Sequence, residues 1–134
     1  MRYLLDTNIC IYALNKRPPL VLEHIRNTDP ADVCISVVTQ LELRHGAEKS
    51  RYREKTHRKL DAFLGPLQIL PLEQHDAEEA ARIRAMLQMN GTPIGDYDCL
   101  IAGQARARKL TLVSNNLREF DRVDDLRTAN WAIG

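Results

Sequence analysis

The sequence predicts a three-layer α/β/α fold with a short, mainly parallel sheet. Short apolar runs alternate with longer segments of helical periodicity, and this alternation is typical of parallel strands that are covered by helices on both faces. The chain has 134 residues, of which 44% are hydrophobic. This length and composition suit one compact hydrophobic core, and the chain is too short for two ordinary domains. We therefore expect a single domain over residues 1–134.

Short apolar runs are expected to form the strands of this sheet. They are rich in Leu, Ile and Val, as buried parallel strands are. These runs cover residues 3–5, 33–35, 67–72 and 110–113. The C-terminal residues 130–133 are expected to add a short edge strand.

The segments between the strands begin and end with residues that are typical of helix boundaries. Asp6-Thr7-Asn8 can cap a first helix, Ser36 can cap a long helix, and Gly65-Pro66 ends the charged helix that follows. Asn90-Gly91 ends a later, amphipathic helix. The expected helices cover approximately residues 9–14, 18–27, 37–49, 52–64, 74–89 and 96–109.

Composition and charge exclude several classes of protein. With 19 basic and 18 acidic residues, the net charge of +1 neither favours nor excludes a polyanionic partner. The three cysteines lie far apart and lack zinc-finger spacing, which argues against a disulfide framework or a structural zinc site. No apolar stretch could span a membrane, and the N-terminus reaches Asp6 before a signal-peptide core could form. We expect a cytoplasmic protein without a membrane partner.

Asp6 and Asn116 each lie just past the end of an expected strand. In open α/β sheets, functional groups gather in the crevice at the carboxyl ends of the strands. Asp6 could equally be an ordinary helix cap, and the segment Ser114–Phe120 could be a plain Asn-rich turn. Position alone leaves both interpretations open.

Glu42 and Asp98 lie on or beside apolar helix faces. Helical spacing places Glu42 beside Val38, Leu41 and His45, where a carboxylate is costly unless it pairs with a basic residue or binds a metal. Asp98 is followed at positions i+3, i+4 and i+7 by apolar residues, so its carboxylate falls on the apolar stripe. The first turn of its helix favours an ionised carboxylate.

The acids together suit a hard divalent cation. Carboxylate and amide oxygens without His or Cys partners favour Mg²⁺ or Mn²⁺ over zinc. Such ions stabilise the attacking and leaving oxygens of a phosphodiester and lower the pKa of the attacking water. The pattern predicts a metal-dependent nuclease whose candidate catalytic site is the acidic cluster of Asp6, Glu42 and Asp98.

An aspartyl-phosphate phosphohydrolase is the competing enzyme class. Asp6 follows an apolar strand, as the nucleophile of such an enzyme would. That chemistry needs a second Asp two residues later to transfer a proton, and the side chain of Asn8 cannot do so. The chain is also short for that fold.

Over essentially its full length, the sequence resembles the PIN-domain ribonuclease toxins called VapC. The resemblance rests on the segments LDTNICIY (5–12), ISVVTQLEL (35–43) with GAEKS (46–50), GTPIGDYD (91–98), LIAG with AR (100–106), and VSNN with REF (113–120). It implies the toxin of a type II toxin–antitoxin system, an endoribonuclease that hydrolyses RNA phosphodiester bonds. Asp6, Glu42 and Asp98 would then be its three metal-binding acids.

The sequence departs from the commonest VapC pattern at position 116, where it carries Asn in place of Asp. A neutral amide binds a cation more weakly, so we expect Asn116 and Glu119 to be weaker ligands, with Glu119 substituting or assisting. Ser114, where relatives often have Thr, could orient a carboxylate or a water. Asn116 is also the one feature that favours a catalytically inactive PIN module, which would bind only RNA or its antitoxin.

The resemblance also implies protein partners. VapC toxins dimerise and are held inactive by a small VapB antitoxin, which lays an apolar segment over the helices near the site and offers a basic side chain to the acids. We therefore expect a homodimer and a hetero-oligomer with a VapB-type antitoxin.

A basic segment is the candidate RNA-binding surface, although an ordinary solvated helix face explains it equally well. Its candidate phosphate contacts are Lys49, Arg51, Arg53 and Lys55. Aromatic residues make up only 5% of the chain, which favours recognition of a folded RNA by its shape over extensive base stacking. A structured RNA such as tRNA fits this composition and the family resemblance.

Overall fold

The computed structural model describes residues 1–133 and contains a five-stranded sheet. The strands are β1 (Tyr3–Leu5), β2 (Val33–Ser36), β3 (Gln68–Leu70), β4 (Thr111–Val113) and β5 (Thr128–Ala129). Their order is β3-β2-β1-β4-β5, and every neighbouring pair is parallel. The predicted parallel sheet is confirmed, and β1 lies at its centre.

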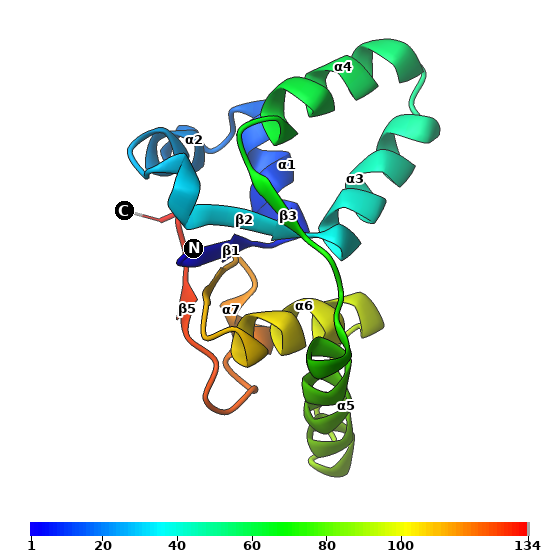
Figure 1. Ribbon diagram of the computed structural model, residues 1–134, viewed down its shortest axis with the longest axis vertical. Coiled ribbons are helices and arrows are strands. Elements are labelled where there is room, and N and C mark those ends of the chain that lie inside the picture. The colour runs from blue at the N-terminus through cyan, green and yellow to red at the C-terminus, as the bar shows by residue number, and fades with distance from the viewer. Residues whose placement is uncertain (134) are drawn as a thin grey trace.

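Helices cover both faces of the sheet, which confirms the predicted three-layer architecture (Figure 1). One face carries α1 (Thr7–Asn15), α2 (Pro19–Arg26), α3 (Val37–Glu48) and α4 (Arg53–Leu64). The other face carries α5 (Gln74–Met89), α6 (Asp96–Ala107) and α7 (Leu117–Phe120). A short 3₁₀ helix, η1 (Pro30–Asp32), leads into β2.

Alternation along the strands divides the apolar core into two parts. Leu4 and Leu112 pack against α5, α6 and α7, whereas Leu5 and Val113 pack against the helices of the opposite face. All four side chains are fully buried. Successive residues of a strand point to opposite faces, so two adjacent leucines of β1 anchor both layers.

Gly103 allows α5 and α6 to approach each other closely. A Cβ atom at position 103 would lie 2.6 Å from the backbone nitrogen of Ala80, a distance at which the two backbones would have to move apart. Glycine is therefore required at this crossing, because any side chain would separate the helices.

A buried ion pair joins the start of α5 to the residue that follows α6. Asp76 is only 2% exposed, and its carboxylate accepts hydrogen bonds from Arg108 at 2.8 and 3.2 Å. Burial by itself raises the pKa of Asp76, but the Arg108 and Glu73 hydrogen bonds outweigh it and hold the pKa below its ordinary value. The pair fixes the ends of two helices that position the candidate site.

Several predicted boundaries hold, and others are wrong. Asp6 and Ser36 cap their helices as expected, each accepting a hydrogen bond from a backbone N–H of the first turn. The edge strand lies at Thr128–Ala129, before the predicted residues 130–133, because only the earlier pair aligns with β4. The expected turn after β4 contains the short helix α7.

The helix expected over 96–109 ends at Ala107, because Lys109 adopts a left-handed backbone conformation with φ 57°. The strand expected over 67–72 is shorter than predicted, because only Gln68–Leu70 pair with β2. Phe120 and Trp131 pack in the core, as expected. No helix within residues 1–133 has the length and apolar character needed to cross a bilayer.

Candidate active site

Asp6 lies at the carboxyl end of the central strand and caps α1. Its Oδ1 accepts a hydrogen bond from the backbone N–H of Ile9 at 2.9 Å, and its carboxylate also accepts one from the hydroxyl of Ser114. The side chain is only 5% exposed. Burial raises the pKa of Asp6 more than these hydrogen bonds lower it, and the nearby charge of Glu42 raises it further. Asp6 is therefore both an ordinary helix cap and a carboxylate at the end of the central strand, so the two interpretations of the sequence do not exclude each other.

Glu42 enters the site from α3 and is held by a threonine of α1. The Oγ1 of Thr7 donates a hydrogen bond to the Oε1 of Glu42 at 2.7 Å. The prediction that Glu42 borders an inward-facing apolar stripe is wrong in part, because Leu41 is 53% exposed and His45 is also exposed. Sequence reasoning missed Thr7 as a functional residue, although its place directly after Asp6 puts it at the same edge of the sheet.

Asp98 lies in the first turn of α6, and its predicted apolar neighbours are buried. Ile101, Ala102 and Ala105 are each at most 1% exposed. Burial is the largest of the causes that raise the pKa of Asp98 to about 6. The other causes are the negative charges of neighbouring acids, which are Glu119, Asp6 and Glu42.

The loop after β4 supplies the fourth acid. Glu119 lies on α7, and its Oε2 accepts a hydrogen bond from the Nδ2 of Asn116 at 2.8 Å. The backbone N–H of Asn116 donates to the Oγ of Ser114, also at 2.8 Å. After burial, the charge of Glu119 is the strongest influence on the pKa of Asp98, so the two carboxylates lie near each other.

Glu42 and Asp98 border an open hollow. The hollow has a volume of about 410 Å³ and is lined by Glu42, Gly95, Asp96, Tyr97 and Asp98. Gly95 lies directly beside Asp98, since a Cβ at position 95 would be in ordinary contact with the Asp98 Oδ2 at 3.4 Å. Tyr97 is 47% exposed at its rim.

The four acids have no positive partner in the part of the chain that the structure describes. The ion pairs there involve other carboxylates, and none joins a Lys, Arg or His to Asp6, Glu42, Asp98 or Glu119. Uncompensated negative charge of this kind raises the pKa of carboxyl groups, as it does for Asp6 and Asp98. A bound cation would remove this electrostatic cost.

The donor set fits a hydrated, hard cation. Within residues 1–133, no three His, Cys, Asp or Glu side chains stand close enough together to form a complete metal-binding group as they lie. Mg²⁺ commonly uses only one or two carboxylates and keeps several waters, so spaced acids suit it better than they suit zinc. The oxygen-only chemistry of Asp6, Glu42 and Asp98 is consistent with that mode.

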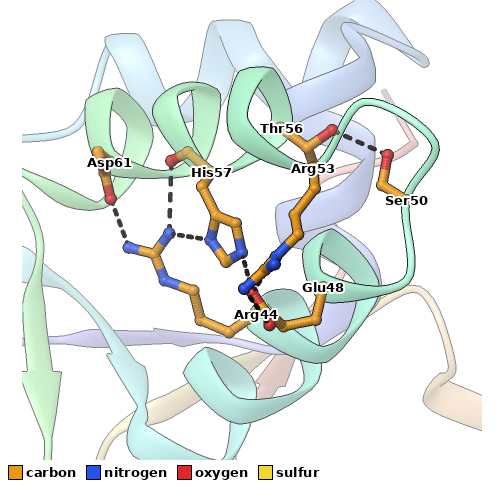
Figure 2. A network of polar contacts seen from close by, with 7 residues as sticks. All are labelled: Arg44, Glu48, Ser50, Arg53, Thr56, His57 and Asp61. Atoms are coloured by element: carbon orange, nitrogen blue, oxygen red, sulfur yellow. Dashed lines mark hydrogen bonds and ion pairs between the residues drawn. The ribbon is translucent and has the colours of Figure 1, made fainter.

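The predicted RNA-binding residues lie near the connection between α3 and α4. Arg53 is already engaged there, because it forms an ion pair with Glu48 at 2.8 Å. Glu48 also contacts His57, whose ring contacts Arg44, so these side chains tie the two helices together (Figure 2). The other candidates are exposed and form no ion pair within residues 1–133; they are Lys49, Arg51 and Lys55.

Comparison with known proteins identifies the family. The PIN domain model matches residues 3–126. The chain is 41% identical to the tRNA(fMet)-specific endonuclease VapC of Shigella flexneri, over 98% of this chain and 99% of the relative. It is 44% identical to the ribonuclease VapC2 of Haemophilus influenzae, over 98% of each protein. The chain belongs to the VapC family of PIN-domain ribonucleases.

Solved VapBC complexes share the fold of this VapC-family chain. The complex from Salmonella typhimurium, which is bound to DNA, matches with a TM-score of 0.92 and 39% identity over 98% of each chain. VapBC2 from Rickettsia felis, bound to a fragment of its promoter DNA, matches with a TM-score of 0.89 and 37% identity over 98% of this chain and 99% of that one. The resemblance predicted from the sequence is confirmed.

Proposed function

We propose that this VapC-family chain is the toxin of a type II toxin–antitoxin system, a Mg²⁺- or Mn²⁺-dependent endoribonuclease. One observation carries the proposal: Asp6, Glu42, Asp98 and Glu119 converge on one edge of the sheet without a basic partner in residues 1–133. Such a cluster is stable only if a cation joins it or a carboxyl takes up a proton.

The chain's own residues hold the acids in place. The Ser114 hydroxyl and the Ile9 N–H fix Asp6, and Thr7 orients Glu42 from the neighbouring helix. Asp98 is placed by the helix that packs on α5. A divalent ion bound there would activate a water and offset the charge of the scissile phosphodiester. The open hollow beside Asp98 leaves room for a phosphate.

We propose a folded tRNA as the substrate. Relatives that are 41% and 40% identical to this chain are named tRNA(fMet)-specific endonucleases, so initiator tRNA is the first RNA to test. Exposed basic side chains after α3 would contact its phosphates without reading sequence. Those proposed to do so are Lys49, Arg51, Arg53 and Lys55. An RNA substrate of this kind places the activity in the cytoplasm.

We propose a VapB-type antitoxin as the inhibitor. A groove of about 200 Å³ runs between α1, α3 and α4, is lined by Ile11, Leu14 and Leu60, and reaches Glu42. Its apolar walls suit an apolar segment, and Glu42 at its margin suits a basic side chain of the same segment. The related VapBC complexes support this partner.

We also propose that the chain forms a homodimer through the apolar surface between α3 and α6. Leu41 and Tyr97 are 53% and 47% exposed there, and Val37, Leu72 and Leu100 line the same hollow. Exposed apolar surface that is gathered in one place marks an interaction site. Tyr97 also borders the acidic hollow, so a second copy seated here would lie beside the active site.

Cleavage of initiator tRNA by the purified protein tests the proposed function. We expect cleavage that requires Mg²⁺ or Mn²⁺, stops with EDTA, and falls by at least about 100-fold in Asp98→Asn. The matched control is Asp124→Asn, an exposed Asp outside the hollow, which should cleave as the unchanged protein does. Cleavage that survives EDTA or Asp98→Asn contradicts the proposal, and RNA binding without cleavage identifies an inactive PIN module.

A further inference from the structure

Asn116 makes two hydrogen bonds within the candidate site, one to Ser114 and one to Glu119. It lies between β4 and α7 and is half-buried. Its backbone N–H donates to the Oγ of Ser114, and its side-chain Nδ2 donates to the Oε2 of Glu119, each at 2.8 Å. Asn116 thus contacts Glu119 directly and contacts Asp6 through Ser114.

The backbone N–H of Asn116 holds the side-chain oxygen of Ser114. Ser114 is fully buried, and a serine hydroxyl has a single proton. The Ser114 oxygen accepts from the Asn116 N–H, and its hydroxyl donates to the carboxylate of Asp6, which can only accept when ionised. The backbone of Asn116 therefore helps to orient Asp6.

The side-chain bond fixes Glu119. A glutamate at the end of a one-turn helix has several accessible rotamers, and ordering such a side chain costs free energy. The Asn116 amide holds one carboxylate oxygen of Glu119, while the other has no donor among residues 1–133. The charge of Glu119 lies near enough to Asp98 to raise its pKa, so Asn116 holds an acid of the same cluster.

We propose that Asn116 is a positioning residue of the metal site, which orients Glu119 and, through Ser114, Asp6, and that it does not itself bind the metal. The proposal rests on the proposed function, since it requires a divalent cation at these acids. It explains why an amide suits position 116: the nitrogen donates to Glu119, whereas an Asp would place a second negative charge against that carboxylate.

Mn²⁺ affinity measured by isothermal titration calorimetry separates the two roles of Asn116. If Asn116 positions Glu119, Asn116→Asp weakens Mn²⁺ binding by about tenfold or more, although it adds a carboxylate. If Asn116 were a ligand, the same change would tighten binding, because a carboxylate is a stronger ligand than an amide. Tighter binding by Asn116→Asp would overturn the proposal.

Asn115→Asp is the matched control. It adds the same charge one residue away, where the side chain bonds Tyr12 and Asn130 rather than the acids. We expect its Mn²⁺ affinity to stay within about twofold of that of the unchanged protein. A loss as large as that of Asn116→Asp would show a nonspecific charge effect and would overturn the proposal.

A double-mutant cycle keeps the test valid if Asn116→Asp does not fold. Asn116→Ala should weaken Mn²⁺ binding about fivefold in the unchanged background but less than about twofold in a Glu119→Ala background, because the amide then has no carboxylate to hold. Equal losses in both backgrounds would overturn the proposal. An unchanged protein that binds no Mn²⁺ would instead remove the metal site itself, and with it both proposals.

Discussion

Replacing Asp98 by Asn is expected to stabilise the metal-free protein while it abolishes cleavage. The rise of the Asp98 pKa from 3.8 to about 6 corresponds to at most about 3 kcal/mol, since a tenfold change in proton affinity is about 1.4 kcal/mol. Asp98 is only half-buried, so solvent screening reduces this to roughly 1 to 2 kcal/mol. Asp98→Asn should therefore raise the melting temperature at pH 7.5 by about 5 °C.

The pH dependence of this stabilisation follows from the direction of the pKa shift. A carboxyl whose pKa is raised in the folded state destabilises the fold once the unfolded chain ionises, so the cost begins near pH 4 and is complete above about pH 6. The gain from Asp98→Asn should thus fall to about a third of its neutral value at pH 4.5.

Urea unfolding of both proteins in EDTA, followed by circular dichroism at pH 4.5 and 7.5, measures this difference. An equal gain at both pH values, or a loss of stability at pH 7.5, would refute the electrostatic reasoning. Adding Mg²⁺ should stabilise the unchanged protein and close the gap, because the ion binds only its folded state.

Three further changes test other parts of the structure. Gly103→Ala should lower the free energy of unfolding by about 3 kcal/mol in urea titrations, because the added Cβ meets the backbone at Ala80; an unchanged midpoint would refute this packing. Arg108→Met should cost about 3 kcal/mol at neutral pH by leaving Asp76 buried and unpaired, and this cost should shrink as the pH falls below about 4 and through the lowered pKa of Asp76; a cost that does not depend on pH would contradict the lowered pKa. A variant with alanine at Lys49, Arg51 and Lys55 should release about three fewer counterions on RNA binding, measured as the slope of affinity against salt concentration in filter binding. An unchanged slope would remove this surface from the RNA interface.

The layers of the fold could be predicted because the strands and helices that form them are marked by the hydrophobic pattern of neighbouring residues. Apolar runs and capping residues gave β1, β2, β4 and the long helices, since strand and helix periodicity is a property of neighbouring residues. The edge strand Thr128–Ala129 could not be found this way. It has no apolar run, and only pairing with the distant strand β4 makes it a strand.

Local spacing likewise predicts some features of the candidate site, whereas others depend on contacts between distant segments. The stripe of Asp98 was predicted correctly because its neighbours at 101, 102 and 105 lie on one helix and are buried within the chain. Glu42 was placed beside Leu41 on a buried stripe, yet Leu41 is exposed, since helical spacing shows an apolar face but not whether this chain covers it. The contact of Asn116 with Glu119 depends on side-chain geometry, which spacing does not give.

The wide separation of the acids along the chain means that the proposed site forms only when nearly the whole domain is folded. Asp6 follows β1, whereas Glu119 lies on α7, and β5 comes later still in the chain. A fragment that ends before α7 would lack both the fourth acid of the proposed site and the edge strand. Proteolysis before α7 is therefore expected to remove the proposed activity, although Asp6, Glu42 and Asp98 all remain in the fragment.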